Sequence, residues 1–198
     1  MKICKHTALM MTAAALSMTA CDKSKMAEHN AEQAGHNAEA TAAAHPSDPV
    51  ESAMAAAPES VSKAAAVITM NPDGTMKTLR EGTNGFTCMP DNPASPGPDP
   101  MCMDANALKW VEAMLAKKAP PQNAGFMYML AGGTDASNVD PYAKEPGGEG
   151  WIETGPHVMV VGAPALNALY KGGAKPDTKV PYVMWEGTPY AHLMIPVH

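Results

Sequence analysis

Aromatic residues, positive charge and long apolar runs are all scarce in this chain of 198 residues. Aromatic side chains make up 5% of the sequence, which excludes a large aromatic core. The formal net charge is -6 without a basic face, and this excludes nucleic acid as a partner. The length fits one domain with attachments, and nothing in the composition demands a second domain.

The first apolar run, from Ala8 to Leu16, is too short to cross a bilayer as a mature helix. Two lysines precede it and small residues follow it, which is the three-part form of an export signal. The end of this segment, Leu-Ser-Met-Thr-Ala-Cys, is similar to a bacterial lipobox, in which Cys21 is lipidated and becomes the mature N-terminus. We therefore expect a signal peptide at residues 1–20. The alternative is an ordinary cleaved signal with an incidental cysteine.

Lipidation of Cys21 predicts an envelope protein that is anchored by acyl chains to a bacterial membrane and faces the periplasm or the exterior. Residues 21–63 are rich in Ala, Glu, Ser, Asn and His and have few large aliphatic side chains, so we expect a flexible, disordered tether. Its histidines suggest either a loose metal-binding tract or a low-complexity spacer: His29, His36 and His45.

Residues 64–198 predict a single globular α+β domain with a mostly antiparallel sheet, one main helix and one short helix. Asp104 is a suitable N-cap for the main helix, which should run to about Lys118. The short helix is expected between residues 163 and 170. The predicted strands lie at residues 66–70, 75–80, 125–131, 157–161, 181–186 and 190–197.

After export, Cys88 and Cys102 would be the only thiols left beside the lipidated cysteine. An oxidising compartment favours a disulfide between them, and their spacing does not fit a Cys-x-x-Cys redox pair. A soft-metal site is the alternative, because thiolates and thioethers suit Cu(I). That site would combine the two cysteines with Met89, Met101 and Met103.

The pattern His-x-Met occurs twice in predicted strands, at His157 and Met159 and again at His192 and Met194. In a strand, His and Met of each phrase share one face. If the two strands pair, the four side chains form a candidate ligand or metal site that Trp185 and Met184 can cover. Copper is the cofactor that this hypothesis implies, because imidazole and thioether are soft ligands. The simpler interpretation is two inward, hydrogen-bonded histidines packed beside methionine.

A catalytic interpretation uses the same histidines as general bases in an envelope hydrolase. Their acidic partners would come from Asp135, Asp140, Glu153 or Glu186. The chain lacks the usual nucleophile, zinc-protease and phosphate-loop motifs, so binding of a small molecule, ion or envelope protein is favoured over catalysis.

The polar loop at residues 134–150 is a weaker candidate site. Asp135, Asn138 and Asp140 offer oxygen ligands for Ca²⁺, but they lack the further ligands and the terminal Glu of an EF-hand loop. Asx-turn chemistry explains the same residues.

Several phrases resemble those of an uncharacterised family of exported bacterial lipoproteins: residues 80–88, 137–143, 155–159 and 184–192. The resemblance extends from about Ile68 to Val197 and implies a single folded unit. That family has no assigned activity, so the resemblance supplies no catalytic residue.

Overall fold

This computed structural model describes residues 48–133, 135–144 and 146–197. The predicted signal peptide, Cys21, the three tether histidines and most of the predicted tether lie outside these residues. Within the described ranges, no helix has both the length and the apolar character needed to cross a membrane.

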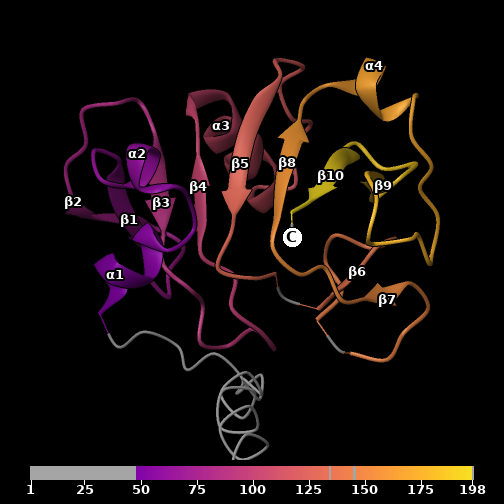
Figure 1. Cartoon of the computed structure of the whole chain (residues 1–198), viewed down its shortest axis with the longest axis horizontal. Coiled ribbons are helices and arrows are strands. Elements are labelled where there is room, and N and C mark those ends of the chain that lie inside the picture. The colour runs from indigo at the N-terminus through magenta and orange to yellow at the C-terminus, as the bar shows by residue number, and fades with distance from the viewer. Residues whose placement is uncertain (1–47, 134, 145, 198) are drawn as a thin grey trace, which may run out of the picture. The chain divides into compact units, whose positions relative to one another are not determined.

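An eight-stranded sheet forms the centre of the fold, in the order β2-β1-β3-β4-β5-β8-β10-β9 (Figure 1). Every neighbouring pair is antiparallel except β1 and β3. The predicted mostly antiparallel α+β fold is therefore confirmed. The strands are β1 Ala66–Met70, β2 Met76–Arg80, β3 Thr87–Met89, β4 Met101–Met103, β5 Gly125–Met129, β8 His157–Val161, β9 Tyr182–Met184 and β10 His192–Pro196.

Short elements complete the described part of the chain. A separate pair of strands, β6 and β7, lies in the loop region between β5 and β8. The main helix α3 begins after Asp104 as the sequence predicted, but it ends at Leu115, before the expected end near Lys118. The remaining elements are β6 Ala136–Ser137, β7 Trp151–Ile152, α1 Pro49–Met54, α2 Glu59–Ser62, α3 Ala105–Leu115 and α4 Pro164–Asn167.

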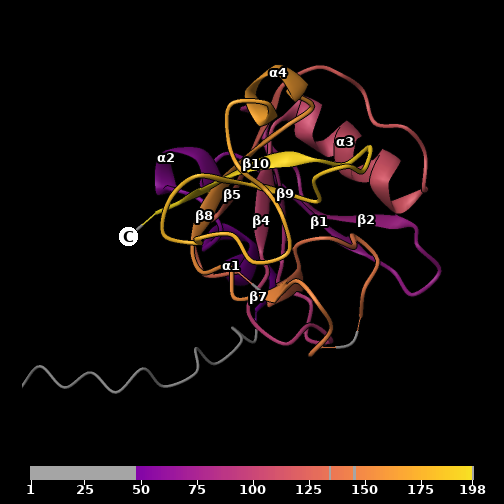
Figure 2. The ribbon, with the colours of Figure 1, turned by 90° about the vertical axis from the view of Figure 1, so that its right-hand side faces the viewer.

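The helices cover opposite faces of the sheet, as Figure 2 shows for α2 and α3. Strand alternation decides which side chains each face receives. On β4, the Cys102 side chain packs with α1, whereas Met103 packs with α3. One face is therefore rich in alanine and carries the cysteines, and the other is rich in methionine.

Cys88 and Cys102 occupy directly opposite positions on β3 and β4 and are joined by a disulfide, as the sequence predicted. Both cysteines are fully buried on the face that α1 covers. The alternative soft-metal site is wrong because alternation points the flanking methionines to the other face, and because a disulfide leaves no thiolate to bind a metal.

The sequence predicted that the packed domain starts at residue 64. Helices α1 and α2 show that it starts earlier. The Asp48 carboxylate caps α1 by accepting hydrogen bonds from the backbone N–H groups of Val50 and Glu51. Ala53 and Ala56 are fully buried against the disulfide region. Alanine is small enough for a helix to pack closely there, and a segment without large aliphatic side chains does not stand out in the sequence as part of a core.

Two contacts fix α3 across the methionine-rich face. The Asp104 carboxylate caps the helix through the N–H groups of Asn106 and Ala107, at 3.0 and 2.8 Å, and also accepts the Phe126 N–H of β5 at 2.9 Å. Gly125 of β5 lies so close to the helix that a Cβ there would overlap the Ala107 backbone. The helix start is therefore held directly against the central strand.

Candidate functional site

Four neighbouring strands each carry a Met or His two residues before a Met on the same face of the sheet. The pairs are Met101 and Met103 on β4, Met127 and Met129 on β5, His157 and Met159 on β8, and His192 and Met194 on β10. The register places one methionine from each strand directly opposite the next. This cross-strand methionine row is Met103, Met127, Met159 and Met194.

The two histidines lie on either side of this row. His157 is opposite Met129 on β5 and Pro196 on β10. His192 is opposite Met184 on β9. Because β8 and β10 are antiparallel, the two His-x-Met phrases run in opposite directions, and Met159 pairs with Met194 while the imidazoles lie at opposite ends of that pair.

The strands of the two phrases are therefore neighbours, but the register does not place both histidines beside one another. Each histidine is directly opposite a methionine on a neighbouring strand, Met129 for His157 and Met184 for His192. The arrangement gives two separate His–Met neighbourhoods that share the central methionines.

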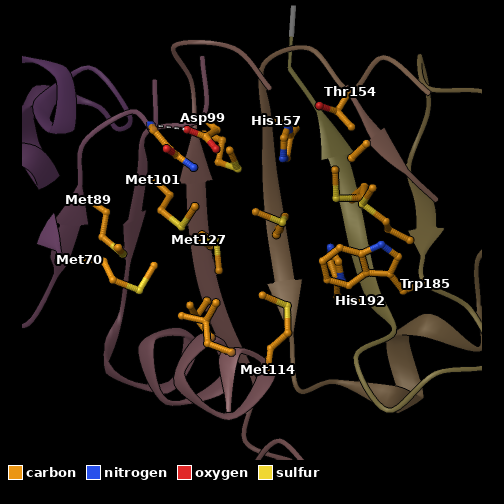
Figure 3. Close-up of a pocket in the computed structure, with 18 of the residues that line it drawn as sticks. Met70, Met89, Asp99, Met101, Met114, Met127, Thr154, His157, Trp185 and His192 are labelled. Atoms are coloured by element: carbon orange, nitrogen blue, oxygen red, sulfur yellow. Dashed lines mark hydrogen bonds between the residues drawn. The ribbon is translucent and has the colours of Figure 1, made fainter. Parts of the chain in front are cut away.

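A cavity of about 290 Å³ lies over this face and includes both histidines in its lining (Figure 3). Val111, Met114 and Leu115 of α3 line it from the helix side. Nine methionines contribute to its lining: Met70, Met89, Met101, Met114, Met127, Met129, Met159, Met184 and Met194. The cavity is thus lined mainly by thioethers and apolar carbon, with few polar groups.

The His192 imidazole presents one free nitrogen in the interior. Its Nδ1 lies 2.9 Å from the Tyr190 carbonyl oxygen, so Nδ1 carries the proton and donates it. The neutral ring then has a lone pair on Nε2. This atom is buried and has no hydrogen-bond partner within the described ranges. A backbone carbonyl that fixes the tautomer in this way is the usual support of a metal-binding histidine.

Aromatic rings enclose His192. Its ring centroid lies 4.9 Å from that of Trp185 and 5.3 Å from that of Trp110, both in edge-to-face geometry. Burial lowers the pKa of His192 to about 4, the Tyr190 carbonyl raises it, and His157 lowers it further. The imidazole is therefore neutral at neutral pH and available as a ligand rather than as a cation.

His157 has the same tautomer at the other end of the methionine pair. Its Nδ1 lies 2.6 Å from the Gly155 carbonyl oxygen, which leaves Nε2 with the lone pair. The side chain is buried, and burial lowers its pKa, while the Gly155 carbonyl raises it. A Cβ at Gly133 would overlap Thr154 Oγ1 and the Gly155 carbonyl oxygen and would lie 3.0 Å from Cε1 of His157, so only glycine fits beside this ring and its hydrogen-bond partner.

Trp185 is held beside His192 in an unfavourable backbone conformation. Its φ of 58° lies in the left-handed region, which bulky residues rarely adopt. The indole Nε1–H donates to the Ser137 carbonyl and the backbone N–H to the Asn138 carbonyl, both at 2.8 Å. Strained residues of this kind concentrate at functional sites. The strain supports a role for Trp185 in the cavity.

The polar loop residues have structural contacts. Asn138 is fully buried, and its side-chain amide donates to the carbonyls of Gly173 and Val183. Asp140 accepts the Tyr142 N–H at 2.9 Å in an Asx turn, the alternative that the sequence analysis gave for this loop. Asp135 precedes β6. The described ranges contain no group of three or more His, Cys, Asp or Glu residues able to hold a metal ion.

The His-x-Met pattern predicted the two histidines with Met159, Met194, Met184 and Trp185. Met101 was expected only in a site with the cysteines, and Met127 and Met129 were not expected in any site. Met101 and Met127 each begin a Met-x-Met phrase with the same spacing as His-x-Met. This shared spacing could have identified the additional methionines, because residues two apart in a strand lie on the same face of the sheet.

Comparison with known proteins finds no matching family model, no matching curated protein and no matching solved structure. The resemblance to exported bacterial lipoproteins therefore stays a prediction.

Proposed function

We propose that this protein is a non-enzymatic Cu(I)-binding protein of the bacterial envelope, with its principal site at His192. One observation carries the proposal: the buried, unpartnered and unprotonated Nε2 of His192 lies in a cavity lined by thioethers. A buried polar atom without a partner is unfavourable, and a bound metal ion would satisfy it.

Three methionines occupy positions near His192 on its face of the sheet. Met184 is its direct partner on β9, Met194 lies two residues along β10, and Met159 is the direct partner of Met194. Residues directly opposite in a sheet have Cβ atoms about 5 Å apart, within reach of a flexible methionine side chain. The His192 imidazole with the sulfurs of Met184 and Met194 would form the site.

The donor set selects the metal. Imidazole and thioether are neutral, soft ligands that suit Cu(I), whereas Mg²⁺ and Ca²⁺ require oxygen ligands. A monovalent ion also carries less charge into the interior than a divalent ion does. Trp185 and Trp110 would further stabilise a cation, since aromatic faces attract positive charge.

Catalysis is less well supported than binding. The Nδ1 atoms of both imidazoles bond to backbone carbonyls rather than to carboxylates. A histidine whose pKa is about 4 is also a weak base near neutral pH.

An apolar small molecule is the second candidate ligand. The cavity of about 290 Å³ approaches the size of small-molecule sites, and its methionines can adapt to different shapes. A solvatochromic apolar dye that binds in the cavity would test for such a ligand. If Cu(I) binds without displacing the dye, the copper site and the apolar site are separate.

The proposed location rests on the sequence. The lipobox-like segment that ends at Cys21 supports lipid anchoring to a bacterial membrane, facing the periplasm or the exterior. Metabolic labelling with palmitate should mark the protein and fail for Cys21→Ala. Equal labelling of both would contradict the anchor.

Cu(I) titration of the purified full-length protein tests the proposed site. Ascorbate keeps copper reduced without attacking the disulfide, and a chromophoric Cu(I) chelator competes for the ion. We expect His192→Phe and Met184→Leu to weaken binding at this site by at least about 10-fold, since each removes one metal ligand. Phenylalanine keeps an aromatic ring between the two tryptophans, and leucine keeps an apolar side chain opposite β10.

Met76→Leu is the matched control because Met76 lies on β2 and does not line the cavity. Thermal unfolding of each variant confirms that it is folded. The proposal is wrong if folded His192→Phe and Met184→Leu bind Cu(I) at this site as tightly as the Met76→Leu protein does.

A further inference from the structure

We infer that the same cavity holds a second Cu(I) site at its other end, formed by His157, Met129 and Met159. The inference rests on the proposed function and extends it from one ion to two. It also assigns a role to His157, which the principal site does not use.

The second end offers the same types of ligand as the first, one imidazole and neighbouring thioethers. His157 has its Nδ1 engaged with the Gly155 carbonyl at 2.6 Å, so Nε2 is its only nitrogen able to bind a metal. Met129 is its direct partner on β5, just as Met184 is the direct partner of His192 on β9. Met159 lies two residues along β8 on the same face. Figure 3 shows His157 and His192 as separate positions in one cavity.

The register argues against a single site that uses both histidines. His157 is opposite Pro196, four residues along β10 from His192. Four residues of strand span about 13 Å, so the two histidine backbones are well separated along the sheet. Each Nδ1 is also hydrogen-bonded to a carbonyl that precedes its own phrase, so each ring is fixed by its own strand. Two ions therefore fit the arrangement better than one.

The central methionines connect the two ends. Met159 and Met194 face each other between the histidines, and Met127 is the direct partner of Met159 on the next strand. Neighbouring strands lie about 4.8 Å apart, and flexible thioether side chains can exchange an ion over that separation. This arrangement allows Cu(I) to pass between the sites by replacement of one neutral ligand at a time, with no change in the oxidation state of copper or sulfur.

Counting bound ions tests the second site. Native mass spectrometry and chelator competition on the full-length protein should give two Cu(I) per chain for the unmodified protein. We expect one each for His157→Phe and His192→Phe, and none for the double variant. Met129→Leu should weaken only the ion that His157→Phe removes, and Met76→Leu should retain both. Thermal unfolding checks that each variant is folded.

The two proposals fail in different ways. One ion per chain, lost in folded His192→Phe and retained in both His157→Phe and Met129→Leu, would overturn the second site and leave the proposed function intact. No Cu(I) binding by the unmodified protein would overturn both. Two ions that persist in His157→Phe would also contradict the second site.

Discussion

Met159 and Met194 are directly opposite each other on strands β8 and β10, and both line the cavity. Each is the last residue of a His-x-Met phrase, and the strands run in opposite directions. The pairing therefore brings the two thioethers together and sends the two imidazoles to opposite ends. A parallel arrangement in the same register would have placed His beside His and Met beside Met.

Cu(I) affinity at the His192 site should change little with moderate acidification. Because burial lowers the His192 pKa to about 4, the imidazole stays neutral at pH 5.5 and protons do not compete with copper. We expect less than about a 2-fold loss of affinity between pH 7.5 and 5.5, compared with about 10-fold for an ordinary histidine. Chelator competition in His157→Phe isolates this site. A 10-fold loss there would contradict the buried neutral ligand.

The free energy of unfolding should fall on acidification. His192 takes a proton below about pH 6.5 in the unfolded chain but only below about pH 4 in the folded one. The unfolded state therefore binds more protons in this window, and up to roughly 3 kcal/mol of stability present above pH 6.5 is lost by pH 4. His157 acts in the same direction, since burial also lowers its pKa.

Urea unfolding at pH 7 and pH 5 measures this effect, and His192→Phe should lose less stability over that interval than the unmodified protein. Burial raises the pKa of the Asp99 carboxyl, which acts in the opposite sense because the folded state then holds its proton to higher pH. Both proteins share that contribution. Equal losses in the two proteins would show that His192 is not a buried neutral group.

Trp185 should report and strengthen copper binding. Its ring centroid lies 4.9 Å from that of His192, so Cu(I) should change its fluorescence. A desolvated cation–π contact contributes up to about 2 kcal/mol, and we expect Trp185→Leu to weaken binding by roughly 10-fold and Trp185→Phe by less. Trp151→Leu is the control, because Trp151 does not line the cavity. Equal affinities for the Leu variants of Trp185 and Trp151 would exclude this contact.

The disulfide should contribute to stability but not to copper binding. Cys88 and Cys102 are 14 residues apart in sequence, and closing such a loop stabilises a fold by about 3 kcal/mol. The double Ala variant should unfold at lower denaturant concentration, which circular dichroism measures. Its Cu(I) affinity at low temperature should stay within about 2-fold, because the cysteines lie on the opposite face from the methionines. Loss of binding by the folded variant would link the two faces.

Local patterns determined much of the fold. Apolar runs placed β5 and β8, the Asp104 cap placed the start of α3, and the export context with two remaining cysteines predicted the disulfide. These features depend on neighbours a few residues apart, so sequence spacing is sufficient. Helix α1 was missed because its buried residues, Ser52 and Ala53, are small, and their close packing against β3 and β4 depends on tertiary contacts.

The sequence by itself determined that each histidine shares a strand face with a methionine, because side chains alternate along any strand. Only the tertiary structure decided which strands are neighbours. The order β4-β5-β8-β10 and its register brought four methionines into one row, placed Met129 opposite His157, and placed Met184 opposite His192. Pairing between strands depends on packing across the whole sheet, so no single phrase of the sequence contains it.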